Sequence, residues 1–206
     1  MMPMLEIVLV EPQIAANTGN IIRLCANVGA RLHLVRPLGF TFDDAALRRG
    51  GLDYHEVVET QLWDTWTACR AALTLERRWF ATTTRVPHRR YDDVNYRPGD
   101  VVVFGCEATG LGEALLAEFP DDCRLRIPMR PSNRSLNLAN AVSVVAYEAW
   151  RQHDFVDAAT GTFAESLRTP AATTLDDEWV KKSPTASTTG GHDLDSARRK
   201  VGETRP

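Results

Sequence analysis

Short apolar runs alternate with amphipathic segments along the first 154 residues. The run LEIVLV at 5–10 is rich in β-branched residues and predicts a buried strand. Apolar residues then recur at helical spacing between 21 and 28, with Asn17 or Thr18 as the expected cap and Gly29 as the expected end. The run RLHLV at 31–35 predicts the next strand. A strand, a helix and a strand within about 30 residues form a βαβ unit, which implies a parallel sheet.

This alternation continues to residue 150. We expect further strands at 56–60, 78–84, 100–105 and 124–129. We expect further helices at 43–50, 63–73, 112–119 and 136–150. Strands that alternate with helices in this way are typical of a three-layer α/β fold, in which helices cover both faces of a parallel sheet.

The composition changes near Asp154. Residues 155–206 are rich in Thr, Ser, Ala, Gly and Pro, contain few apolar residues and show no sustained periodicity. A segment of this kind cannot bury much apolar surface, and its composition predicts disorder. We therefore expect one domain over residues 1–154 and a flexible C-terminal tail over residues 155–206.

The bulk composition is that of an ordinary globular protein, with 44% hydrophobic and 25% charged residues. No window approaches the roughly 18 apolar residues of a membrane span, and the N-terminus is typical of a first strand and not of a signal peptide. The four cysteines form no C-x-x-C pair and no zinc spacing, so we expect free thiols, no metal site and a cytoplasmic protein: Cys25, Cys69, Cys106 and Cys123.

The net charge of −3 does not by itself indicate a nucleic-acid-binding protein. All 17 basic residues in the first 154 positions are Arg, which suits phosphate recognition. Local pairs at 48–49, 77–78 and 89–90 could build a basic face, although ordinary solvated arginines are the simpler interpretation of each pair alone.

Three polar loops follow predicted strands, at 11–20, 105–112 and 128–137. Ligands of parallel sheets bind beyond the carboxyl ends of the strands, so we expect these loops to converge on one site. In the second loop, Gly105, Gly110 and Gly112 would let the backbone approach a ligand closely, although a plain glycine-rich turn is the simpler interpretation of this loop alone. The loop matches neither the dinucleotide fingerprint nor a P-loop.

Two charged residues near these loops allow several roles. Glu107 could cap the helix that follows it, meet a cationic ligand or hold an arginine. Arg23 in the first predicted helix could be a surface residue or a phosphate contact. The third loop is crowded with more Ser and Asn side chains than one helix cap requires, and we expect the surplus to face a ligand: Ser132, Asn133, Ser135, Asn137 and Asn140.

Four stretches together resemble the SPOUT superfamily of RNA methyltransferases, and within it the enzymes that methylate the ribose of the tRNA wobble nucleotide. They are EPQIAANTGNIIRLCANVGARLHLV, GLDYHE, VVVFGCEATGLGEALL and RLRIPMRPSNRSLNLANAVSVVAYEAWRQ, which span about residues 5–153. The resemblance implies a deep trefoil knot at the C-terminal end of the sheet, an exception to the usual rules for chain connections. It also implies a homodimer with the first and last helices at or near the interface.

The resemblance further implies that S-adenosylmethionine (AdoMet) lies bent in the knot and that no metal is required. The cofactor contacts would fall on Thr82, Gly105, Gly110, Ile127 and Ser135. Thr82 departs from the pattern, because relatives often have an apolar residue there.

The catalytic group implied by the resemblance is Arg23, surrounded by Asn17, Glu107, Ser135 and Asn137. Because Arg is effectively always protonated, two roles stay open for Arg23. It deprotonates the 2'-hydroxyl with help from a nearby phosphate, or it stabilises the developing alkoxide as an electrostatic clamp.

The activity implied is methylation of the ribose 2'-hydroxyl of the wobble nucleotide, cytidine or uridine 34, in the anticodon stem-loop of tRNA, with leucine isoacceptors expected. Another tRNA position or a ribosomal RNA is the alternative within the family. A nucleotide-binding hydrolase would lack a nucleophile–base pair in these loops. A non-catalytic RNA-binding module would leave the glycine loop unexplained.

Overall fold

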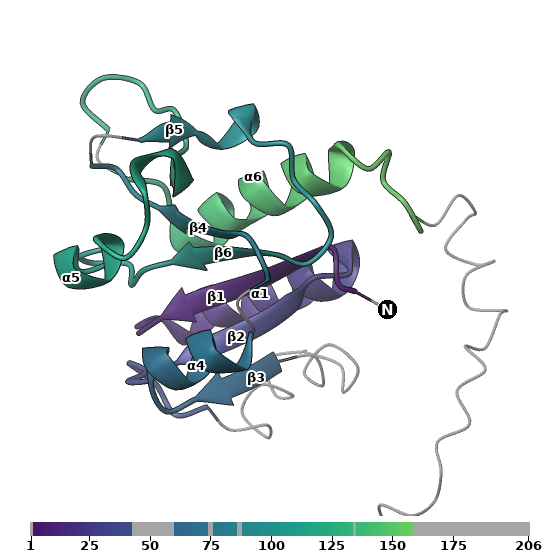
Figure 1. The fold of residues 1–206 in the computed structure, drawn as a ribbon. Helices are drawn as coiled ribbons and strands as arrows, with labels where there is room; N and C mark the ends of the chain where they lie inside the picture. Colours follow the sequence, from purple (N-terminus) through teal and green to yellow (C-terminus); the bar gives the residue numbers. More distant parts are fainter. Residues whose placement is uncertain (1, 43–59, 74–75, 86–87, 134, 159–206) are drawn as a thin grey trace, which may run out of the picture. The chain divides into compact units, whose positions relative to one another are not determined.

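The computed structural model describes residues 2–42, 60–73, 76–85, 88–133 and 135–158. Within them, seven strands form one sheet in the order β3-β2-β1-β6-β4-β7-β5, and every pair in it is parallel (Figure 1). The strands are β1 Leu5–Val10, β2 Arg31–Val35, β3 Thr60–Trp63, β4 Trp79–Thr82, β5 Arg89–Arg90, β6 Asp100–Phe104 and β7 Arg124–Arg126. The predicted parallel α/β architecture is therefore confirmed.

The central strands are buried on both faces. All six residues of β1 are buried, and their side chains alternate between two apolar clusters. Leu5, Ile7 and Leu9 face the cluster that contains helices α1 (Ala15–Val28) and α6 (Leu138–Arg151). Val8 and Val10 face the cluster that contains α4 (Trp66–Ala72) and α5 (Glu113–Leu116). Helices thus cover both faces of the sheet, which gives three layers.

Several predicted boundaries were wrong. Helix α1 begins at Ala15, so Asn17 and Thr18 lie inside its first turn, and the N-cap residue Ile14 offers no side-chain hydrogen bond. Gly29 ends the helix in a left-handed conformation with φ of 67°, as expected. The last strand ends at Arg126, three residues earlier than predicted, and the short strand β5 was not predicted at all.

The region between β2 and β4 also differs from the expectation. Trp63 belongs to β3 and not to a helix, because Thr65 caps the next helix by accepting from the backbone N–H of Ala68 at 3.1 Å. The helix expected at 43–50 and most of the strand expected at 56–60 lie outside the described residues, as does the tail from 159. Residues 155–158 are described, and Phe155 packs edge-on against Trp150 with ring centroids 5.3 Å apart.

Buried charges tie the sheet together away from its carboxyl end. Glu6 of β1 is fully buried and lies 2.8 Å from His33 of β2 and 3.0 Å from Arg77. Trp63 donates to the other ring nitrogen of His33 at 3.1 Å, so a neutral His33 carries its proton toward Glu6. A charge at this depth is tolerated because Arg31, His33 and Arg77 donate to it. None of the described helices has the length and apolar character needed to cross a membrane.

Candidate functional site

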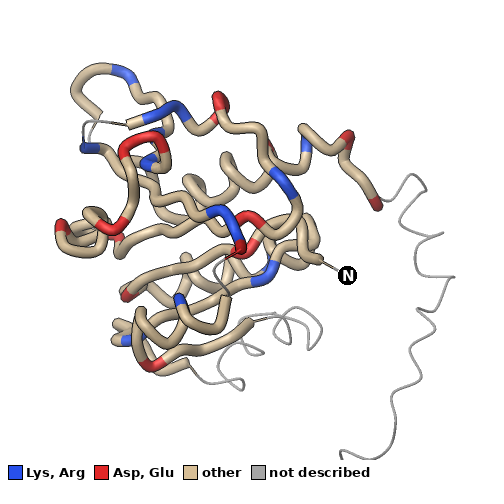
Figure 2. Tube along the Cα trace, viewed as in Figure 1, with Lys and Arg blue, Asp and Glu red and all other residues tan. Residues whose placement is uncertain are grey.

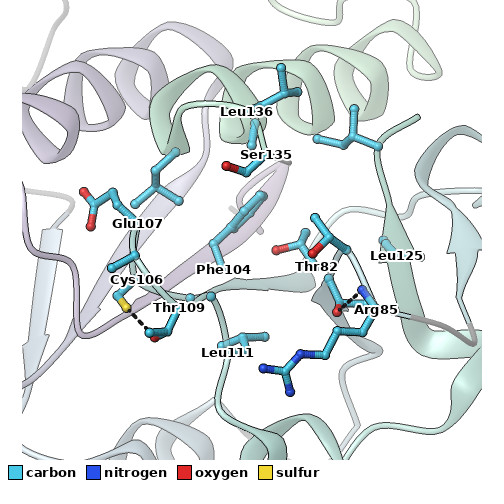
Figure 3. A pocket seen from close by; sticks show the side chains of 18 of the residues that line it. Thr82, Arg85, Phe104, Cys106, Glu107, Thr109, Leu111, Leu125, Ser135 and Leu136 are labelled. Carbon is cyan, nitrogen blue, oxygen red and sulfur yellow. Dashed lines mark hydrogen bonds between the residues drawn. The ribbon is translucent and has the colours of Figure 1, made fainter. Parts of the chain in front are cut away.

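A cavity of about 560 Å³ lies at the carboxyl ends of β4, β6 and β7. Its wall is built by residues 82–85 at the end of β4, residues 104–111 at the end of β6, and part of the segment that leads from β7 into α6 (Figure 3). Apolar side chains such as Leu111, Leu125 and Ile127 alternate in this wall with hydroxyl groups and with glycine backbone. A cavity of this size and mixed character is typical of a small-molecule site.

The loop after β6 forms one side of this cavity by folding back on itself. The backbone N–H of Gly110 donates to the carbonyl oxygen of Cys106 at 2.9 Å, and Gly110 has φ of +68°. A Cβ atom at Gly105 would lie 2.1 Å from the carbonyl carbon of Gly110 and 2.2 Å from the nitrogen of Leu111. Gly105 is therefore required first by the packing of the loop itself, and the resulting tight turn presents backbone groups to the cavity.

Glu107 holds the first loop against the second. Its carboxylate accepts from the backbone N–H of Gln13 at 2.8 Å, from that of Ile14 at 3.2 Å and from the side-chain amide of Asn17 at 2.9 Å. Glu107 therefore caps α1, which lacks a side-chain cap of its own, and not α5 as one predicted alternative proposed. Negative charge at a helix N-terminus is stabilising.

The same hydrogen bonds govern the ionisation of Glu107. Partial burial raises the pKa of its carboxyl group, but the bonds from Asn17, Gln13 and Ile14 outweigh burial and hold the pKa below the ordinary value of 4.5. Glu107 is therefore an anion at neutral pH, where its role is to anchor α1.

Asn137 extends this network to the third loop. It is the N-cap of α6, and its side-chain oxygen accepts from the backbone N–H groups of Ala139 and Asn140 at 2.9 and 3.4 Å. Its side-chain nitrogen donates to the oxygen of Asn17 at 3.0 Å, and Asn17 donates in turn to Glu107. The three loops therefore converge, as predicted, through a directed chain of three side chains.

The Ser and Asn side chains of the third loop do not all lie at the cavity. Ser135 lies in the cavity wall (Figure 3). Asn137 caps α6 and donates to Asn17, so both ends of its side chain are bonded within the protein, and it is not among the residues of the cavity wall. Ser132, Asn133 and Asn140 are exposed and lie outside this wall.

The five positions expected to contact a cofactor all lie in the wall of this one cavity: Thr82, Gly105, Gly110, Ile127 and Ser135. Thr82 was noted as a departure from the pattern of relatives. Its hydroxyl donates to the carbonyl oxygen of Val103 at 3.1 Å, so the neighbouring strand satisfies this polar group.

Only two of the five positions expected to act in catalysis lie in the cavity wall. Glu107 and Ser135 line the cavity, whereas Asn17 and Asn137 lie behind Glu107 in the hydrogen-bonded chain. Arg23 is exposed on α1 and is not among the residues of the cavity wall.

Most residues of the wall were not predicted from the sequence, among them the charged Arg85 and the thiol of Cys106. Arg85 lies at the cavity (Figure 3), and its guanidinium pairs with the carboxylate of Glu113 at 3.3 Å. Cys106 lies 3.0 Å from the hydroxyl of Thr109; partial burial raises the pKa of its thiol, but hydrogen bonds from Thr109 and Ala108 outweigh burial and lower it. The position of Cys106 inside the glycine loop is the sequence signal that could have identified it as a wall residue. Within the described ranges, no three His, Cys, Asp or Glu side chains are grouped so that they could hold a metal ion.

Comparisons with known proteins agree with this arrangement. Residues 4–147 match the model of the SpoU rRNA Methylase family. The chain is 54% identical over 155 residues to the tRNA (cytidine(34)-2'-O)-methyltransferase of Methylovorus glucosotrophus (strain SIP3-4), covering 75% of this chain and 99% of the relative. It is 44% identical, with a TM-score of 0.67, to a protein solved for structural insights into the 2-OH methylation of C/U34 on tRNA, covering 74% of this chain and 98% of that one.

A more distant structure shares the fold. The SpoU methyltransferase AviRb from Streptomyces viridochromogenes, solved in complex with AdoMet, is 23% identical with a TM-score of 0.60, over 75% of this chain and 59% of its own. The match to the family model covers most of the domain that carries the cavity, including all three loops. The chain belongs to the SpoU rRNA methylase family.

Proposed function

We propose that the protein transfers a methyl group from AdoMet to the ribose 2'-hydroxyl of the wobble nucleotide, cytidine or uridine 34, of a tRNA. The observation that carries this proposal is 54% identity over 99% of a relative named for that reaction, together with a cavity formed by the matched loops. The substrate would be the anticodon stem-loop of cytoplasmic tRNA, with leucine isoacceptors as the expected set.

The cavity suits AdoMet in size and chemistry. Its volume of about 560 Å³ lies within the range of ordinary ligand sites. The apolar side chains of Leu111, Leu125 and Ile127 would pack on the adenine ring, and backbone groups of the loop at 105–110 would hold the polar atoms. When bound, AdoMet would supply an electrophilic methyl group.

The residues around this cavity would orient the acceptor. Ser135 in the wall has a hydroxyl that can donate to or accept from the ribose. Asn17, Asn137 and Glu107 would hold the start of α1 against the cavity. Arg23, exposed on α1, would meet the RNA and stabilise the developing alkoxide, because a guanidinium stays protonated and acts best as an electrostatic clamp.

The finer features of the fold are part of the same proposal. The strand β7 lies between β4 and β5, both of which precede it in the chain. An inserted last strand is what a trefoil knot at the C-terminal end of the domain requires, and it supports such a knot here. Three exposed hydrophobic residues, Tyr147 on α6 and Phe155 and Val156 after it, with exposed fractions of 44%, 42% and 51%, support a homodimer that uses α6 and the segment after it.

The test is to map 2'-O-methylation in total tRNA from cells with and without this protein. Loss of methylation at nucleotide 34 in the deleted cells is the expected result. Loss at another tRNA position or in ribosomal RNA would favour the alternative substrates. Unchanged methylation, with no AdoMet binding to the purified protein, would favour a non-catalytic RNA-binding module.

A further inference from the structure

A second, smaller hollow of about 240 Å³ lies beside the cofactor cavity, at the β5 end of the sheet. It is lined by His88, Arg90, Arg126, Pro128 and Met129, and Met129 lines the larger cavity as well. Figure 2 shows arginines on β5 and on segments near it. The hollow is therefore basic and directly adjoins the site proposed for methyl transfer.

Two hydrogen-bond donors are buried at this hollow without a partner. The Nε atom of Arg126 and the Nδ1 atom of His88 are both inaccessible to solvent and make no hydrogen bond within the described chain. The Nε2 atom of His88 lies 3.4 Å from a terminal nitrogen of Arg126. Because a guanidinium can only donate, Nε2 accepts, and a neutral imidazole then carries its proton on Nδ1. Both unpartnered atoms are therefore N–H donors that lack an acceptor.

The charge of Arg126 is also unmatched. Its neighbour in register, Arg90, is paired with Asp92, and Arg124 on the same strand is paired with Asp121 at 2.8 Å. Among the described residues, Arg126 has no carboxylate within ion-pair distance. A buried donor without an acceptor costs free energy, so this pair of side chains is set up to receive an anion.

We propose that Arg126 and His88 bind a phosphate oxygen of the RNA backbone next to the methylated nucleotide. The guanidinium of Arg126, which lines the hollow and has no carboxylate partner among the described residues, suits a phosphate oxyanion. A free phosphate ion has the same chemistry. We favour RNA because Met129 lines both the hollow and the larger cavity, so an RNA strand that brings its ribose to the larger cavity would carry a neighbouring phosphate past the hollow. This inference rests on the proposed function, because it assigns part of the substrate of the same site.

The first test observes the unpartnered Nε–H group of Arg126 directly. The Nε–H resonances of the protein are recorded by NMR, with Arg126 assigned by its loss in the Arg126→Lys variant. Addition of the unmethylated anticodon stem-loop is expected to shift this resonance strongly, whereas inorganic phosphate at the same concentration does not. A shift with inorganic phosphate alone, or no shift with either, overturns the assignment to RNA.

The second test uses kinetics and salt dependence. Arg126→Gln is expected to raise KM for tRNA about tenfold, with kcat and AdoMet affinity unchanged. The slope of log K for tRNA binding against log salt concentration should fall by about 0.7–0.9, the contribution of one phosphate contact. Arg36→Gln is the charge-matched control, since Arg36 is exposed and follows β2 toward the opposite edge of the sheet.

His88→Gln provides a second variant if Arg126→Gln proves unstable in a thermal melt. It keeps the net charge of neutral His88 and is expected to raise KM several-fold with kcat unchanged. If the unmutated protein methylates tRNA and both variants keep its KM and its salt slope, the phosphate subsite is overturned. Absence of methylation by the wild-type protein would instead count against the proposed function.

Discussion

The side-chain nitrogen of Asn137 donates a hydrogen bond of 3.0 Å to the side-chain oxygen of Asn17, 120 residues earlier in the chain. The direction of this bond is set from both ends. The oxygen of Asn137 is occupied by two backbone N–H groups of α6, and the nitrogen of Asn17 is occupied by the carboxylate of Glu107. Neither amide can turn over without breaking a bond, so the start of α6 and the start of α1 hold each other in one arrangement.

The two roles of Asn137 can be separated by substitution. Asn137→Ala removes the cap of α6 and should cost about 1 kcal/mol of stability. Asn137→Asp keeps an excellent cap but presents oxygen to the oxygen of Asn17. We expect Asn137→Asp to melt near the wild-type temperature and to lose roughly tenfold in kcat/KM, equivalent to about 1.4 kcal/mol of transition-state stabilisation. Wild-type turnover by Asn137→Asp would reduce Asn137 to a helix cap.

Glu107→Gln tests the anchor of α1. All three groups that face the Glu107 carboxylate are donors, so the amide nitrogen of Gln would meet at least one of them. We expect a loss of about 1–3 kcal/mol in the free energy of unfolding at pH 7, measured by chemical denaturation.

The pH dependence of this effect has a definite sign. Because the folded pKa of Glu107 lies below its ordinary value of 4.5, its contribution is present above that value and disappears as the pH falls through the folded pKa. The stability difference between wild type and Glu107→Gln should therefore shrink below about pH 4.5. A difference that stays constant through the acid range would show that the charge of Glu107 contributes nothing.

The glycine loop offers a matched pair of substitutions. Gly105→Ala places a methyl group within 2.4 Å of the backbone of Gly110 and Leu111, so the loop must open. Gly112→Ala adds the same methyl group where no atom beyond the adjacent residues of the chain lies within 4 Å. We expect AdoMet affinity, measured by calorimetry, to fall at least about tenfold in the first variant and to stay near wild type in the second. Equal affinities would mean that this turn does not shape the cofactor site.

Arg23→Ala should abolish methyl transfer while AdoMet affinity changes little. The reason is that Arg23 lies on α1, outside the cavity wall to which we assign the cofactor. Calorimetry with AdoMet and a turnover assay on tRNA measure the two quantities separately. Arg36→Gln serves as the control for the loss of one exposed arginine. Turnover like that of the wild type in Arg23→Ala would remove Arg23 from the mechanism.

Local pattern was sufficient to predict the framework. Apolar runs and helical spacing in the sequence indicated β1, α1, β6 and α6, and the alternation indicated a parallel sheet. The three loops could be placed at one edge because parallel strands end on the same side. The residues expected at the cofactor cavity followed from the family resemblance and not from this pattern.

Long-range partners could not be predicted in the same way. Glu6 lies in an apolar strand, and nothing in LEIVLV shows that His33 and Arg77 will surround it. Glu107 caps a helix that begins more than ninety residues earlier. The register that sets Arg90 beside Arg126 depends on the insertion of β7 next to β5, and periodicity along the chain carries no information about such pairings.

The most direct measurement incubates the purified protein with AdoMet and unmodified tRNA, then maps the position of every new 2'-O-methyl group. We expect a single methylated ribose at nucleotide 34, formed by the wild type and not by Arg23→Ala. A methyl group at any other nucleotide, or no methyl transfer to tRNA while AdoMet binds normally, would contradict it.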